Sequence, residues 1–168
     1  MVFKIASISI LCLLSQGKPK TAPVPTDFAI RVSYGDDIID TFQNSYTRKG
    51  VPKKHLINEV PTLIDSTINF RINSVEKAAI YSQLIKMKYT TYPNHLKSKC
   101  VEMVEPGVSI IITVRAKNEE TTINYYDDCI STRDEKAIKL NSLINLVNKI
   151  ARSHDEVKRM PASLNVEL

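Results

Sequence analysis

The side chains best suited to chemistry, three histidines and three cysteines, do not assemble a known catalytic or metal-binding motif. His55, His95 and His154 are separated by 40 and 59 residues, whereas two histidines of a zinc protease stand four residues apart on one helix. We therefore expect solvated histidines, no metal site and no cofactor. A Cys100 nucleophile with a His95 base is the remaining alternative, since thiolate catalysis needs an imidazole within reach.

Paired carboxylates are a second source of chemistry, because glycoside hydrolysis uses two acids that flank the substrate. The acidic pairs Asp36-Asp37, Glu119-Glu120 and Asp127-Asp128 are each adjacent in sequence, and they fall at expected turns or strand ends. We interpret them as turn and solubility residues. A hydrolase assembled from His95, Asp127 and Asp128 is the less favoured alternative.

Nucleotide chemistry is limited by the glycine content. The chain has 168 residues and only 4 glycines, at 17, 35, 50 and 107. Neither G-x-G-x-x-G nor a G-x-x-x-x-G-K phosphate loop can be written with them. With no catalytic signature in sight, the sequence favours a protein that is not an enzyme.

The amino terminus has the pattern of an export signal. Residues 1–17 contain Lys4, an apolar run of about ten residues and small residues at 15 and 17, as in a cleaved signal peptide. Cys12 offers a competing fate, lipidation, although Leu11 precedes it where a small residue is usual. Residues 18–26 hold three prolines and predict an extended tether, and residues 27–168 form one domain.

Cys100 and Cys129 remain after removal of the leader, an even pair in an oxidising compartment. The sequence therefore predicts a disulfide between them, with two buried free thiols as the alternative. The bridge would close a loop of about 30 residues and stabilise the fold by roughly 3 kcal/mol.

The domain shows alternating strands and two amphipathic helices. Alternation predicts strands at 28–34, 38–46 and 68–72 and a hairpin over 109–127 with its turn at 118–120. Helices are expected over 74–88, capped by Asn73, and over 133–152, capped by Ser131 or Thr132. Residues 49–64 and 94–106 are expected to be connections, and 153–168 mostly a polar tail. Together these predict an α+β two-layer sandwich, with an antiparallel sheet of about five strands and two main helices on one face.

The opposite face of that sheet is the natural binding surface, because no predicted helix covers it. The alternation places polar residues there, and the candidate binding residues are Arg31, Thr113, Arg115, Lys117 and Asn124. The net charge of +5 is mild for this length, and we interpret the basic clusters as solvated surface, with weak attraction to an acidic partner or anionic lipid headgroups as the alternative. Nucleic acid is an unlikely partner because the basic clusters lack interleaved aromatics, and a membrane would be met only through a lipid anchor.

The chain resembles uncharacterised small exported, lipoprotein-like α+β domains of Bacteroidetes and some Gram-positive bacteria. The resemblance rests on the run from residue 27 to residue 93, in Phe28-Ala29-Ile30, Tyr34-Gly35, Asp40-Thr41-Phe42, Tyr46-Thr47, Ile68-Asn69-Phe70, Ile80-Tyr81 and Tyr92-Pro93. It implies a protein of the bacterial envelope, periplasm or exterior, and no particular activity.

These observations predict an exported, non-enzymatic module that binds an exported protein or surface polymer through the open sheet face or the 49–64 connection. An inhibitor or immunity-type protein against a secreted hydrolase or toxin is the alternative, since small size, an export signal and a disulfide suit that role as well.

Overall fold

The computed structural model describes residues 23–53, 62–97 and 100–163. The expected signal peptide, most of the tether, Cys12 and His55 therefore lie outside the described residues. Along the chain the elements are β1 (Ala29–Tyr34), β2 (Asp37–Asp40), β3 (Ser45–Pro52), β4 (Leu63–Asn69), α1 (Ser74–Met87), the 3₁₀ turn η1 (Tyr89–Thr91), β5 (His95–Leu96), β6 (Cys100–Ala116), β7 (Glu119–Thr132), α2 (Glu135–Ser153) and α3 (Asp155–Lys158).

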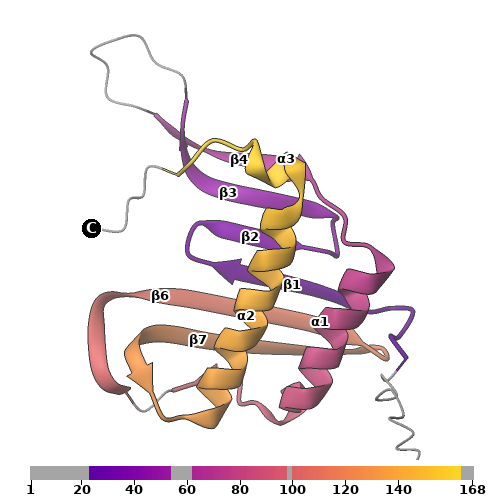
Figure 1. The fold of residues 1–168 in the computed structure, drawn as a ribbon, viewed down its shortest axis with the longest axis vertical. Coiled ribbons are helices and arrows are strands. Elements are labelled where there is room, and N and C mark those ends of the chain that lie inside the picture. Colours follow the sequence, from indigo (N-terminus) through magenta and orange to yellow (C-terminus); the bar gives the residue numbers. More distant parts are fainter. Residues whose placement is uncertain (1–22, 54–61, 98–99, 164–168) are drawn as a thin grey trace, which may run out of the picture.

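The strands form one sheet in the order β4-β3-β2-β1-β6-β7-β5. Neighbouring strands are antiparallel except β5, which pairs with β7 in parallel. Figure 1 shows α1 and α2 side by side across the same face of the sheet. Within residues 23–53, 62–97 and 100–163, the long helices thus lie on one side of the sheet, and no helix covers the other side.

The expected fold class was wrong in its architecture. Among the described residues the sheet has seven strands instead of about five, it is mixed instead of antiparallel, and three α-helices accompany it instead of two. One added strand arises because the segment expected as a single strand over 38–46 forms two, and the other is β5, which contributes two residues at an edge. Short edge strands bury little apolar surface, so their sequence carries little periodic signal.

The strand expected over 38–46 is in fact a hairpin, β2 and β3. Asp40 accepts hydrogen bonds through Oδ1 from the backbone N–H of Phe42 at 2.9 Å and of Gln43 at 3.2 Å. Asn44 then adopts the left-handed conformation, with φ of 52°. An aspartate that satisfies the backbone two and three residues ahead favours a turn over a continuous strand. The connection expected from 49 onward is likewise partly strand, because β3 continues to Pro52 and β4 starts at Leu63.

The sequence predicted the positions of the two long helices more accurately than those of the strands. Asn73 caps α1 by accepting from the N–H of Val75 and Glu76, and Glu76 returns a hydrogen bond to the N–H of Asn73, so the predicted capping box is confirmed. Helix α2 begins two residues later than expected, and its cap is Asp134 instead of Ser131 or Thr132. The predicted tail contains the additional short helix α3.

The core lies between the sheet and the two long helices. The period of two in β1, β6 and β7 turns alternate residues toward the helices, and the period of about four in α1 and α2 supplies the facing stripes. The most deeply buried aliphatic side chains are Ile30, Val32, Ile80, Leu84, Ile110, Ile112, Val114, Ile123, Leu140, Leu143 and Val147. This layer fixes which strand residues can face solvent on the other side.

A polar cluster holds the carboxyl-terminal segment against the sheet. Arg48 pairs with Asp37 at 2.9 Å, donates to the Tyr46 hydroxyl at 2.9 Å and donates to the carbonyl oxygen of Pro161 at 3.1 Å. Burial and the hydrogen bond to Asp37 raise the pKa of Tyr46 to about 12. Tyr46 is therefore a neutral phenol at physiological pH and serves packing.

The hairpin between β6 and β7 turns through Lys117 and Asn118, one residue earlier than expected. Both residues have positive φ, 57° and 62°, as a two-residue type I′ turn requires. The Asp27 carboxylate accepts from both backbone N–H groups, at 2.9 and 2.6 Å. These two bonds tie the start of the domain to the hairpin.

We expect Asp27→Ala to lower the melting temperature at neutral pH, with a difference that narrows in acid. The backbone hydrogen bonds from Asn118 and Lys117 lower the pKa of Asp27 below the ordinary value of an aspartate. A carboxylate with a depressed folded-state pKa stabilises the fold above its unfolded pKa, and this contribution disappears as the pH falls through the folded pKa. Thermal melts of both proteins from pH 7 to about pH 2 test this. A constant difference across that range would show that the charge of Asp27 is irrelevant.

Within the part of the chain that the structure describes, no helix is both long and apolar enough to cross a membrane.

Candidate functional site

The side of the sheet that faces away from α1 and α2 is the candidate site, and we call it the open face. It consists of the strand residues that alternate with the core residues. Cross-strand partners on it include Arg31 with Asp40 and Thr113, and Ser33 with Ile38 and Ile111. In Figure 1 the helices lie in front of the sheet, so the open face points away from the viewer.

Arg31 and Asp40 anchor the centre of the open face. The two residues are cross-strand partners on β1 and β2. The guanidinium of Arg31 donates to Asp40 Oδ2 through Nε at 2.8 Å and lies 2.6 Å from it through Nη2. The Asp40 side chain is 5% exposed and that of Arg31 is 46% exposed. The carboxylate is thus covered by the arginine, which keeps its outer edge in solvent.

The Phe42 ring lies close to two guanidinium groups. The turn that Asp40 caps places the Phe42 ring 4.6 Å from Arg115 Cζ and 5.9 Å from Arg31 Cζ, measured to the ring centroid. A cation over an aromatic face is attracted by the ring quadrupole. Arg31 has Asp40 as its ion-pair partner, whereas no salt bridge to Arg115 is found among the described residues. Arg115 is therefore a stacked, exposed cation whose N–H groups remain available.

Apolar side chains flank this charged centre on β6 and β7. Ile111 is 41% exposed and Tyr126 is 54% exposed. A Cβ at Gly107 would come within 2.8 Å of Cε1 of the Tyr126 ring and 2.9 Å of the Asp127 carbonyl oxygen. The absence of a side chain at Gly107 therefore lets the Tyr126 ring approach the β6 backbone closely while more than half of the tyrosine surface stays in solvent.

Four of the five candidate binding residues lie on the open face. Arg31 and Thr113 are direct partners, and Arg115 lies two residues further along β6. The Thr113 hydroxyl is 3.3 Å from that of Thr122. Asn124 faces the same side, but its amide donates to the Asn94 carbonyl at 3.0 Å and so holds the entry to β5.

Lys117, the fifth candidate, lies apart from the other four. It occupies the β6–β7 turn and lines a cavity of about 430 Å³ at the end of α1, together with Tyr81, Lys88, Tyr89 and Glu119. Because the chain leaves the strand geometry at this turn, the alternation that places Arg115 on the open face does not extend to Lys117.

Phe42 and Asp40 are the site residues that the sequence interpretation missed. The sequence pattern places both in a continuous strand, which hides their positions on the open face. The sequence Asp40-Thr41-Phe42-Gln43 contains a signal for this turn. An aspartate can accept hydrogen bonds from the backbone N–H groups two and three residues after it, which is typical of a turn closed by a side-chain carboxylate.

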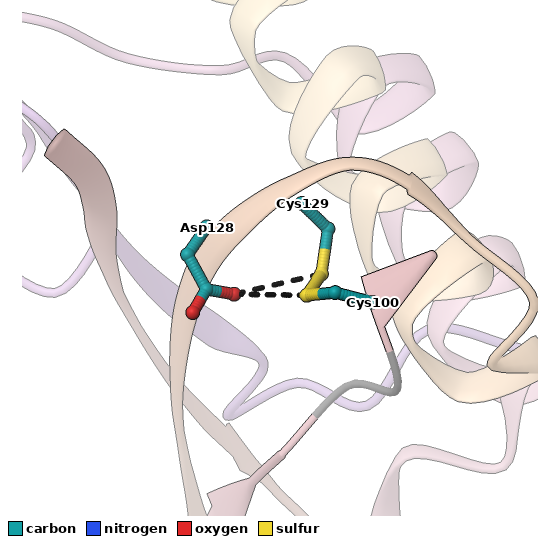
Figure 2. A group of neighbouring side chains, drawn as sticks. All are labelled: Cys100, Asp128 and Cys129. Carbon is teal, nitrogen blue, oxygen red and sulfur yellow. Dashed lines mark hydrogen bonds between the residues drawn. A yellow bond between two sulfur atoms is a disulfide. The ribbon is translucent and has the colours of Figure 1, made fainter. Parts of the chain in front are cut away.

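Cys100 and Cys129 form the predicted disulfide, with Cα atoms 5.3 Å apart. It joins the start of β6 to the end of β7, where Met103 pairs with Cys129. Figure 2 shows the carboxylate of Asp128 directed at the bridge, with Oδ1 3.2 Å from Cys100 Sγ and 3.5 Å from Cys129 Sγ. These three residues are close enough to surround a metal ion, but the two sulfurs are bonded to each other and offer no thiolate.

His154 and Asp127 contact neighbouring side chains, and His95 lies in a strand. His154 joins α2 to α3, with Nε2 3.0 Å from Glu76 Oε1 and its ring edge-on to Phe70 at 4.8 Å between centroids. His95 is exposed on β5 opposite Asn124. Asp127 accepts from the Tyr125 hydroxyl at 3.0 Å.

Comparison of the sequence with models of known protein families found no match, and comparison with curated proteins found no significant relative.

Proposed function

We propose that this chain is an exported, non-enzymatic binding module of the bacterial envelope, and that its open face binds a protein partner. The observation that carries the proposal is the guanidinium of Arg115, which is stacked on Phe42 and has no ion-pair partner among the described residues. Arginine and aromatic side chains are enriched among the residues that dominate protein interfaces. A stacked guanidinium also loses less conformational freedom on binding than a free one.

The chemistry of the open face indicates what the partner would present. Arg115 offers several N–H donors in one plane, which suit a carboxylate or backbone carbonyl oxygens. Ile111 and Tyr126 offer exposed apolar surface beside it. The partner would therefore combine an acidic or carbonyl-rich segment with apolar side chains. An inhibitor that docks on a secreted hydrolase or toxin is one form of such a module.

We expect Arg115→Glu to abolish partner binding and to leave folding intact. Arg115 is exposed, stacks on Phe42 and has no salt bridge among the described residues, so the charge reversal removes binding donors without opening the core. Lys149→Glu makes the same change of net charge on an exposed position of α2 and serves as the control.

The measurement is the amount of each tagged variant that co-purifies with cross-linked envelope protein from the producing cells, with thermal melting of each variant alongside. Equal recovery of both variants would contradict the assignment of the open face. Unfolding of Arg115→Glu would show that this face is structurally buried.

Export is supported by the disulfide, which is compatible with an oxidising compartment. We expect the protein isolated from its host to begin at Lys18, or at a lipidated Cys12, and to be two hydrogen masses lighter than its reduced form. Intact-mass spectrometry under non-reducing conditions measures both. A retained leader together with free thiols would contradict export.

A further inference from the structure

Strand β4 forms one edge of the sheet, and β3 is its only strand partner among the described residues. It contains no proline or lysine and a single charge, Asp65. The bulge in this ladder adds its extra residue to β3, between Arg48 and Val51, and not to β4. Native edge strands are normally shortened, bulged or charged to prevent pairing with another chain. A seven-residue edge strand with one charge, no proline and no bulge of its own is therefore suited to pair with another strand.

The register shows which backbone groups of β4 point outward. The N–H of Phe70 donates to the Asn44 carbonyl at 2.8 Å and that of Lys53 to the Thr62 carbonyl at 3.0 Å, so these bonds bracket the β3–β4 ladder. Alternate residues of an antiparallel strand bond to opposite sides. The even-numbered residues of β4 therefore bond toward β3, and the backbone groups that point away from it belong to Leu63, Asp65, Thr67 and Asn69.

A groove runs beside this edge on the helix side of the sheet. A cavity of about 460 Å³ is bounded by Ser66, Ile68 and Asn69 on one side and by Glu156, Arg159, Met160 and Pro161 on the other. Leu63 and Ile64 are 46% and 44% exposed on the same strand. A strand added to β4 would satisfy the outward backbone groups and place alternate side chains in the groove.

We propose that the occupant is β4 of a second copy of this chain, which forms a symmetric dimer with one continuous sheet. A two-fold axis at Ser66 pairs residues 63–69 with residues 69–63 of the partner subunit. Ile64 then lies opposite Ile68 of the partner subunit, and Asp65 opposite Thr67 of the partner subunit, so that no like charges face each other directly. The groove carries both signs of charge, through Glu156 and Arg159, as a self-complementary interface requires.

The test compares Asp65→Pro with Asp65→Ala in the full chain. Both variants remove the carboxylate, but only proline removes an N–H group, and that group points away from β3. We expect the wild type and Asp65→Ala to approach twice the protomer mass in sedimentation equilibrium as concentration rises from micromolar toward millimolar. Asp65→Pro should dimerise at least about tenfold more weakly with an unchanged circular dichroism spectrum.

A second variant, Ile64→Lys, covers the case in which Asp65→Pro fails to fold. Ile64 is 44% exposed, so lysine is tolerated in the protomer but places a charge against the apolar partner position. Loss of the dimer in this variant supports the proposal. A wild-type chain that stays monomeric at all concentrations, or a folded Asp65→Pro or Ile64→Lys variant that dimerises like the wild type, overturns it.

Discussion

Loss of the Cys100–Cys129 bridge is expected to lower the free energy of unfolding by about 3 kcal/mol. The bridge spans 29 residues and joins the far ends of the β6–β7 hairpin, so it restricts the unfolded chain while the native ladder already holds the two ends close. A loss of this size is a large share of the stability of an ordinary domain.

Urea unfolding of the wild type and of the Cys100→Ser/Cys129→Ser variant, each with and without reductant, measures this effect. The reduced wild type should match the variant, and reductant should not change the variant. Equal midpoints for the oxidised wild type and the variant would mean that the bridge contributes nothing to stability. A reductant effect on the variant itself would show that the difference has another cause.

Asp40→Ala is expected to cost about 2–3 kcal/mol, because a nearly buried carboxylate loses hydrogen bonds to Arg31 and to the N–H groups of Phe42 and Gln43. The ion-pair contribution itself is small, since Arg31 is half exposed. Loss of the turn geometry should also displace Phe42 from beneath Arg115 and so weaken partner binding.

Asp40→Asn is the matched comparison. It can keep an oxygen acceptor at the Oδ1 position for the two backbone N–H groups, but its amide NH2 replaces the oxygen that accepts from Arg31, so the charge and the hydrogen bonds to Arg31 are lost. We expect it to unfold at a midpoint between those of the wild type and Asp40→Ala in chemical denaturation. If alanine and asparagine destabilise equally, the turn hydrogen bonds are not the source of the effect.

The parts of the fold that the sequence predicted are those set by local patterns. The alternation over 109–127 and the Asn73–Glu76 capping box depend on residues within a few positions of each other, and both correspond to observed elements. The strand expected over 38–46 was wrong because Ile38, Phe42 and Tyr46 preserve an apolar spacing across a turn that one carboxylate closes. Edge strand β5 depends on pairing with the distant β7, which no local pattern reveals.

The sequence predicts those residues of the open face that alternate with core residues along a strand. It does not predict a residue that reaches the face through packing between distant strands. Arg31, Thr113, Arg115 and Asn124 follow from the period of two. Phe42 belongs to the face only because the turn after β2 brings its ring beside a strand residue that is distant in sequence. The position of Lys117 differs because its turn has positive φ, which ends the alternation.

The central claim is that the open face, and not the helical face, meets the partner. Site-specific photo-crosslinking in the producing cells tests it most directly, with the crosslinker at Thr113 on the open face or at Ser142 on the exposed side of α2. We expect an adduct of one defined mass from position 113 only, and its loss when Arg115→Glu is added. The same adduct from position 142, or an adduct at 113 that survives Arg115→Glu, would contradict this account.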